Sequence, residues 1–169
     1  MQIVVVGIAD CQVSNDPECT LATYALGSCI AVAIWDPVVR VGGLLHYMLP
    51  DSGIDGVKSR ERPYMFADTG IPLLFRRAYE YGAQKHRMLV RVAGGAQVMD
   101  DNGVFDIGKR NYLALRRILW KAGVLIHAED VGGTESRSLR LEVPTGALWL
   151  RTAGGAEREM AVSRAARKA

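Results

Sequence analysis

The sequence lacks the features that would place the protein in a membrane or direct it to secretion. No apolar run reaches the roughly 18 residues that a membrane-spanning helix needs. Met1 is followed directly by the apolar segment QIVVVGIAD, without the basic segment and small-residue cleavage site of a signal peptide. We therefore expect a soluble, cytoplasmic protein that does not insert into membranes.

Cysteine is also scarce, and its spacing argues against two kinds of structure. The chain has three cysteines, Cys11, Cys19 and Cys29, and an odd number in a cytoplasmic protein argues against a disulfide framework. No Cys-x-x-Cys pair occurs, so the usual spacing of a zinc site is missing. We expect no metal site, and we interpret Cys11 and Cys19 as structural residues or as exposed residues without a role in the chemistry.

An excess of charge is absent too. The formal net charge is +3, and no stripe of Lys and Arg interleaved with aromatic residues is visible, so nucleic acid is not an expected partner. The length of 169 residues favours a single domain, and nothing demands more than a monomer. We assign residues 1–151 to this domain. Residues 152–169 lose the apolar pattern, and we treat them as a tail that is either frayed or helical on a partner.

Short apolar runs bounded by turn residues predict about seven strands. The run 30–36 is continuously apolar and ends at an Asp-Pro pair, as a core strand does. The other strands are expected within 3–9, 41–49, 87–92, 124–128, 137–143 and 147–151, and residues 20–26 can also be extended. The polar segment 51–62 is expected to be a mobile surface loop.

Two segments with helical periodicity separate these strands. Near 67–81, Leu74, Ala78 and Tyr81 recur on one helical face, and Gly82 follows as a C-terminal stop. A second helix is expected over 109–122. The strands cluster before the first helix and after the second. This order predicts an α+β fold with the helices packed on one side of largely antiparallel sheet.

The segment TYALGSCIAVAIWDP, residues 23–37, contains the first candidate for chemistry. Gly27 and Ser28 precede Cys29, and such small residues leave room for an incoming carbonyl group. Backbone N–H groups of a tight loop can also face the oxyanion that forms when a thiolate attacks a carbonyl carbon. The alternative to a catalytic role is that Cys29 is a small core residue, because cysteine is often buried.

His46 lies in the next apolar run. The alternative to a catalytic role is a buried core histidine whose ring nitrogens are hydrogen-bonded. If Cys29 opens one strand and His46 closes the next in an antiparallel pair, the two lie at the same end. A protonated histidine there would lower the pKa of the thiol. Thr23 is available to fix the orientation of the imidazole, as the third member of a catalytic triad does.

Other polar residues are weaker candidates. Ser28 could be a nucleophile, but a neutral serine needs more activation than a cysteine. His86 and His127 receive no role, and the acidic pair Asp100 and Asp101 is interpreted as turn residues. The glycine pairs at 94–95 and 132–133 lack the lysine of a phosphate loop. We interpret them as tight turns beside the site.

The motifs LGSC, with Cys29, H-x-M-L-P, with His46, and I-G-x-R-N, at residues 107–111, resemble those of the chemoreceptor glutamine deamidase family, CheD. The similarity extends over roughly residues 2–151 and excludes the tail. It implies a layered α/β/β fold with a β-sandwich and helices on one face, as in a group of bacterial toxin and cysteine-hydrolase domains.

The resemblance also implies an activity: conversion of glutamine side chains in the cytoplasmic helices of chemoreceptors to glutamate, with release of ammonia. The nucleophile maps onto Cys29, the general base onto His46 and the orienting hydroxyl onto Thr23. Gly27 and Ser28 would support the oxyanion. This chemistry requires no metal or organic cofactor. The implied partners are chemoreceptors and, in many bacteria, a CheC-type phosphatase of the response regulator.

One position departs from the family pattern. The glycine loop reads Ala93-Gly94-Gly95-Ala96, where the family usually carries phenylalanine before the glycine pair. This change leaves open an alternative, a binding module with weak or no catalysis that regulates receptors or the phosphatase. A small-molecule amidase is a third class, which would need a closed pocket.

Overall fold

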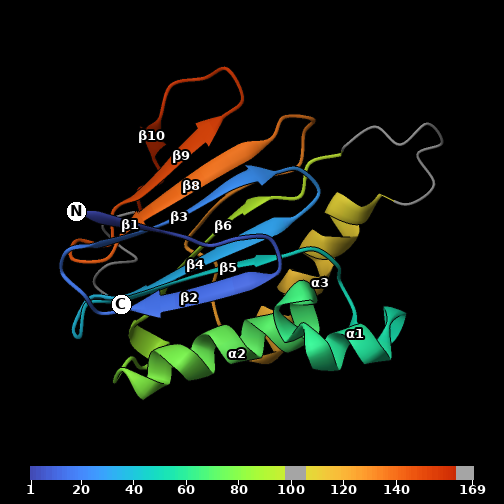
Figure 1. Ribbon diagram of the computed structural model, residues 1–169, viewed down its shortest axis with the longest axis horizontal. Coiled ribbons are helices and arrows are strands. Elements are labelled where there is room, and N and C mark those ends of the chain that lie inside the picture. Colours follow the sequence, from blue (N-terminus) through green and yellow to red (C-terminus); the bar gives the residue numbers. More distant parts are fainter. Residues whose placement is uncertain (98–105, 163–169) are drawn as a thin grey trace.

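The computed structural model describes residues 1–97 and 106–162, which form three layers (Figure 1). One five-stranded sheet has the strand order β1-β3-β8-β9-β10, and a second has the order β2-β5-β4-β6-β7. Helices α2 (Ala67–Glu80) and α3 (Ile107–Lys121) cover the outer face of the second sheet. Within the described ranges, no helix is long and apolar enough to cross a lipid bilayer.

The remaining elements in the described residues are the short helix α1, ten strands and three short 3-10 helices, η1 (Ser52–Ile54), η2 (Pro63–Met65) and η3 (Lys85–Arg87). Their bounds are α1 (Gly56–Glu61), β1 (Gln2–Val5), β2 (Asp10–Ser14), β3 (Cys19–Leu26), β4 (Ile30–Asp36), β5 (Val41–Tyr47), β6 (Leu89–Gly94), β7 (Ala128–Val131), β8 (Arg137–Glu142), β9 (Leu148–Thr152) and β10 (Arg158–Glu159).

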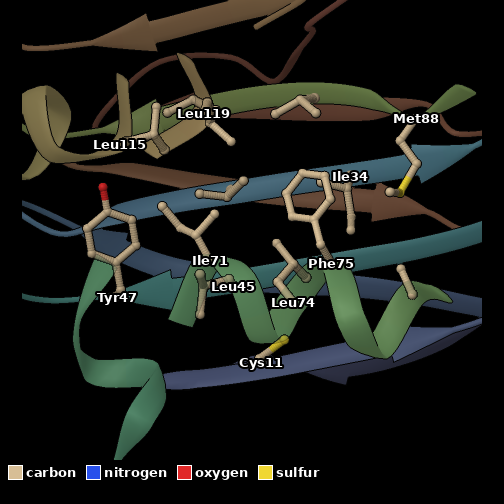
Figure 2. Packing of buried hydrophobic residues seen from close by; sticks show 14 of the residues in the cluster. Cys11, Ile34, Leu45, Tyr47, Ile71, Leu74, Phe75, Met88, Leu115 and Leu119 are labelled. Atoms are coloured by element: carbon tan, nitrogen blue, oxygen red, sulfur yellow. The ribbon is translucent and has the colours of Figure 1, made fainter. Parts of the chain in front are cut away.

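The central strand β4 shows why the layers form. Its side chains alternate between the two faces, and both faces are apolar. Ile30, Val32 and Ile34 pack with the helices, whereas Ala31 and Ala33 pack toward the first sheet. Figure 2 shows the helix side of this arrangement, where Ile71, Leu74 and Phe75 of α2 lie against the sheet with Ile34 and Leu45. Two cores therefore share one central sheet.

The predicted fold class is confirmed. Most neighbouring strands are antiparallel, and the parallel pairs β1–β3 and β6–β7 each involve a strand at the edge of its sheet. β4 has the predicted bounds, and both long helices begin and end within two residues of the prediction. These elements carry continuous apolar runs or clear helical periodicity, which local sequence reports directly.

Three expectations in the chain before residue 152 were wrong or incomplete. β2 was not expected, because its residues DCQVS show only a short alternation among turn residues. Segment 51–62, expected to be a loop, contains α1, whose N-cap Asp55 accepts a hydrogen bond from the Lys58 N–H. The strand expected at 124–128 begins only at Ala128, because the Val124 N–H donates to the Leu119 carbonyl and closes the end of α3.

The first part of the segment assigned to a tail is packed onto the sheet. β10 pairs antiparallel with β9, and the Met160 N–H donates to the Leu148 carbonyl over 2.7 Å. Met160 and Val162 are buried, and the buried Arg91 donates from Nη1 to the Met160 carbonyl. Up to residue 162 the chain is therefore neither a frayed end nor a helix.

Core packing under α2 predicts a large effect of Leu74→Ala. Leu74 is fully buried between α2 and the second sheet, so the truncation should lower the free energy of unfolding by about 2–5 kcal/mol. Leu113→Ala on α3 is the control, because Leu113 is half exposed and should cost less than about 1 kcal/mol. Urea unfolding of both variants measures the difference, and equal costs would contradict this description of the core.

Candidate active site

Strand register places Cys29 and His46 on the same face of the second sheet. His46 of β5 pairs with Ala31 of β4, and both side chains face the first sheet. Cys29 lies two positions before Ala31, packs against the same inter-sheet core, and is therefore a diagonal neighbour of His46. The expectation that the two residues lie at the same end of the antiparallel pair is confirmed.

Thr23 meets His46 from the opposite sheet. Its Oγ1 lies 2.8 Å from Nδ1 of His46 and 2.7 Å from the carbonyl oxygen of Val6. The hydroxyl has one proton, which it donates to the Val6 carbonyl, so it accepts the hydrogen bond from the His46 Nδ1–H. The imidazole is thus held with Nε2 unprotonated. Among the described residues Nε2 has no hydrogen-bond partner, although it is buried.

Burial makes the resting pair neutral. His46 has no exposed surface, and this burial lowers its pKa from 6.5 to about 4. Burial also raises the pKa of the half-buried Cys29 thiol above its ordinary value, with a smaller opposing effect from the residue's own N–H. The expectation that a protonated histidine lowers the thiol pKa is therefore wrong for the resting site.

The loop before β4 directs its carbonyl groups into the protein. The carbonyls of Gly27 and Cys29 accept hydrogen bonds from the Ala96 and Gly95 N–H groups at 2.9 and 2.8 Å. The Ser28 carbonyl accepts one from the Asn111 side chain at 2.9 Å. In contrast, the N–H groups of Ser28 and Cys29 donate to no other described residue. These two amides remain available to an oxygen atom placed beside the sulfur.

Both glycine pairs lie beside this loop. Gly94 has φ +114°, and a Cβ atom there would overlap the Cys29 carbonyl oxygen, so only glycine permits this approach. The Gly132 N–H donates to the Gly94 carbonyl over 3.0 Å, which brings the second pair to the same place. Ala93 is fully buried in the inter-sheet core, where it pairs with Ala31.

Sequence reasoning missed Asn111 and Tyr47. Asn111 is fully buried, and its Nδ2 donates to the carbonyls of Ser28 and Met48. The Tyr47 hydroxyl donates to the Asn111 carbonyl over 2.7 Å. A usable signal exists in the sequence, because Asn111 lies four positions before Leu115 on the apolar face of its helix. A polar side chain is unusual on such a face and indicates a specific hydrogen-bonding role.

The other candidates lie apart from this group. Cys11 and Cys19 are buried, and burial raises the pKa of the Cys11 thiol to about 12. His127 accepts a hydrogen bond from the Val90 N–H, and His86 is exposed. Asp100 and Asp101 lie outside the described residues. In residues 1–97 and 106–162, no group of three His, Cys, Asp or Glu side chains is placed to hold a metal ion.

Comparison with known proteins identifies close relatives. A family model described as "CheD chemotactic sensory transduction" matches residues 48–152. "Probable chemoreceptor glutamine deamidase CheD" of Solibacter usitatus is 59% identical over 154 residues, which are 91% of this chain and 91% of that protein. "Chemoreceptor glutamine deamidase CheD" of Thermotoga maritima is 38% identical over 90% of this chain and 94% of its own. Among solved structures, Bacillus licheniformis hypothetical protein YfiH has a TM-score of 0.42 and 17% identity, covering 72% of this chain and 49% of that one.

The close approach at Gly94 predicts that Gly94→Ala is much more costly than a glycine substitution elsewhere. Gly154 is the matched control, because it also has a positive φ, +73°, but open space around it. Gly154→Ala should lower the free energy of unfolding by about 1 kcal/mol. Gly94→Ala must also displace the Cys29 backbone and should cost about 3 kcal/mol or more. Urea unfolding tests this, and similar costs for the two variants would refute it.

The lowered pKa of His46 predicts that the free energy of unfolding decreases as the pH is lowered. Between its folded pKa of about 4 and its unfolded value of 6.5, only the unfolded chain binds the proton, so acid favours unfolding. From about pH 7 to about pH 5, His46 should contribute a loss of about 2 kcal/mol. His46→Gln should flatten this part of the urea-unfolding profile, whereas His86→Gln, at an exposed position, should not. An unchanged profile in His46→Gln would show that another group is responsible.

Proposed function

The chain belongs to the CheD family, and from this premise we propose that it is a protein-glutamine amidohydrolase that deamidates chemoreceptor glutamines to glutamate in bacterial chemotaxis. The observation that carries the proposal is the Thr23–His46 hydrogen bond, which leaves a buried Nε2 with no partner among the described residues, on the sheet face that Cys29 shares. A cysteine nucleophile, a base and a group that orients the base are the parts that acyl transfer requires.

Attack on the glutamine carboxamide begins from the neutral pair. Nε2 of His46 takes the proton of the Cys29 thiol, and the sulfur attacks the carboxamide carbon. The imidazolium that forms keeps donating its Nδ1–H to the Thr23 oxygen, and the Thr23 hydroxyl keeps donating to the Val6 carbonyl. Because burial disfavours both charged forms, we expect the thiolate–imidazolium pair to form with substrate in place, when the Nε2–H and the sulfur both have partners.

The tetrahedral intermediate carries its negative charge on the former carboxamide oxygen. The N–H groups of Ser28 and Cys29 are the candidate donors, because they have no other partner among the described residues. Gly27 completes the turn that presents them. A donor of this kind typically contributes about 10²–10³ in rate.

Collapse of the intermediate releases ammonia, which takes its proton from the Nε2–H of His46. The glutamyl group then remains on the Cys29 sulfur as a thioester. His46, neutral again, removes a proton from water as the water attacks the thioester carbonyl. The sulfur leaves and recovers the proton, and the product is a glutamate side chain.

The substrate we propose is a glutamine on the cytoplasmic helices of a chemoreceptor. We also propose that the protein acts as a monomer and that a CheC-type phosphatase is a further partner. The regulatory binding module drew its support from Ala93. Because Ala93 is buried between the sheets, it forms no part of an exposed surface that would hold a partner. Catalysis is therefore the function that the site supports best.

Incubation with a chemoreceptor cytoplasmic fragment tests the proposal. Wild-type protein should produce the mass gain of glutamine-to-glutamate conversion at defined sites, and Cys29→Ala should abolish it. Thr23→Val should reduce the rate about 100-fold or more, because the Nδ1–H loses its acceptor, whereas Thr23→Ser should retain most activity. Cys19→Ala, a buried cysteine outside the site, controls for general effects of cysteine loss.

Mass spectrometry at peptide resolution gives the result. Conversion that persists in Cys29→Ala would reject Cys29 as the nucleophile. No conversion by wild-type protein, shown by circular dichroism to be folded, would reject the deamidase.

A further inference from the structure

Helix α3 begins against the loop that carries Cys29. Its N-cap Asp106 accepts a hydrogen bond from the Lys109 N–H. A Cβ atom at Gly108 would lie 2.5 Å from the carbonyl oxygens of Gly95 and Ala96, so the first turn packs directly on the glycine loop. This contact brings Asn111, one turn later, to the base of the site.

The Asn111 side chain joins the loop that carries Cys29 to the segment that follows β5, the strand of His46. One Nδ2 donates to the Ser28 carbonyl over 2.9 Å and to the Met48 carbonyl over 2.8 Å. Ser28 is adjacent to Cys29, and Met48 lies two residues after His46. A single planar amide group therefore sets the separation between the backbone before the sulfur and the backbone after the imidazole.

A third hydrogen bond holds the backbone of Asn111 in place. The Tyr47 hydroxyl donates to the Asn111 backbone carbonyl over 2.7 Å, and both residues are fully buried. Tyr47 packs with the helix-side core, whereas its neighbour His46 faces the first sheet. α3 is thus tied to β5 at the residue beside the base.

The side-chain amide of Asn111 lowers the stability of the fold in one respect. Oδ1 of Asn111 is buried without a donor among the described residues, which costs about 1–3 kcal/mol. An apolar side chain would avoid this cost. It would not hold the Ser28 and Met48 carbonyls.

We propose that Asn111 is the positioning residue that holds the Cys29 loop at its working distance from His46, by bridging the Ser28 and Met48 carbonyls. The catalytic consequence rests on the proposed deamidase function. The bridge itself rests on the hydrogen bonds of Asn111. A misplacement of reacting groups by about 1 Å can cost about 100-fold in rate.

The test compares Asn111→Asp with Leu115→Ala. The first replaces the donating NH₂ by an oxygen of the same size. The second truncates a fully buried side chain one turn later on α3 and controls for lost stability. At a temperature where circular dichroism shows both variants folded, Asn111→Asp should lower kcat on the receptor fragment by about 10- to 100-fold with little change in KM. Leu115→Ala should keep kcat within about 2-fold.

Alkylation of Cys29 by iodoacetamide supplies a readout that needs no receptor. Release of the loop exposes the thiol and relieves the burial that raises its pKa. Asn111→Ser, which can serve only one carbonyl and adds no charge, should therefore be alkylated faster than wild type and Leu115→Ala at neutral pH. A rise in alkylation together with a fall in kcat is not expected of a purely structural role. If Asn111→Asp does not fold, Asn111→Ser also takes its place in the comparison of kcat, with the same expected direction.

Two outcomes would overturn the proposal: a kcat that falls no further in the Asn111 variant than in Leu115→Ala, or equal alkylation rates in the Asn111 variant and wild type. If wild-type protein shows no deamidation, the proposed function fails, and the alkylation comparison still decides whether Asn111 positions Cys29.

Discussion

The hydrogen bond between Thr23 and His46 is the interaction on which the rest of the site depends. It crosses from the first sheet to the second at 2.8 Å, inside a largely apolar core. A polar pair in such a place is stable only when its donors and acceptors are matched. The Val6 carbonyl provides that match by accepting the hydrogen bond of the Thr23 hydroxyl, so that Thr23 in turn accepts from the His46 Nδ1–H and Nε2 is left without a partner among the described residues.

The same burial that orients the imidazole keeps the site uncharged at rest. With the pKa of His46 lowered to about 4 and that of Cys29 raised, neither group is ionised at neutral pH. A neutral thiol is a poor nucleophile, so the resting Cys29 is a poor target for alkylation and oxidation. The loop carbonyls accept hydrogen bonds from Gly95, Ala96 and Asn111, whereas the N–H groups of Ser28 and Cys29 donate to no other described residue. In the proposed mechanism these two amides stabilise the developing charge.

The fold was predictable where the sequence pattern is local and strong. β4 could be placed because its apolar run ends at Asp36-Pro37, and the two long helices because their apolar residues repeat at helical spacing. Antiparallel pairing also placed Cys29 and His46 at one end. β2 was missed because it is extended by pairing with β5, which lies far along the chain. β10 was missed because its two residues, Arg158 and Glu159, are polar and are extended only by pairing with β9. The tautomer of His46, the neutral state of the pair and the bridge from Asn111 all depend on contacts between distant segments, which no local pattern encodes.

The first strand has a consequence for how the protein loses activity. β1 pairs within the described residues only with β3, and Ile3 and Val5 are more than half exposed, so this edge is held by few contacts. Edge segments of this kind open locally at a free energy well below that of global unfolding. Such an opening would withdraw the Val6 carbonyl and free the Thr23 proton, and Thr23 could then donate to Nδ1 and leave the proton of the imidazole on Nε2. A rearrangement of one proton, driven by fraying at the edge of a sheet, would silence the base while the rest of the molecule stays folded.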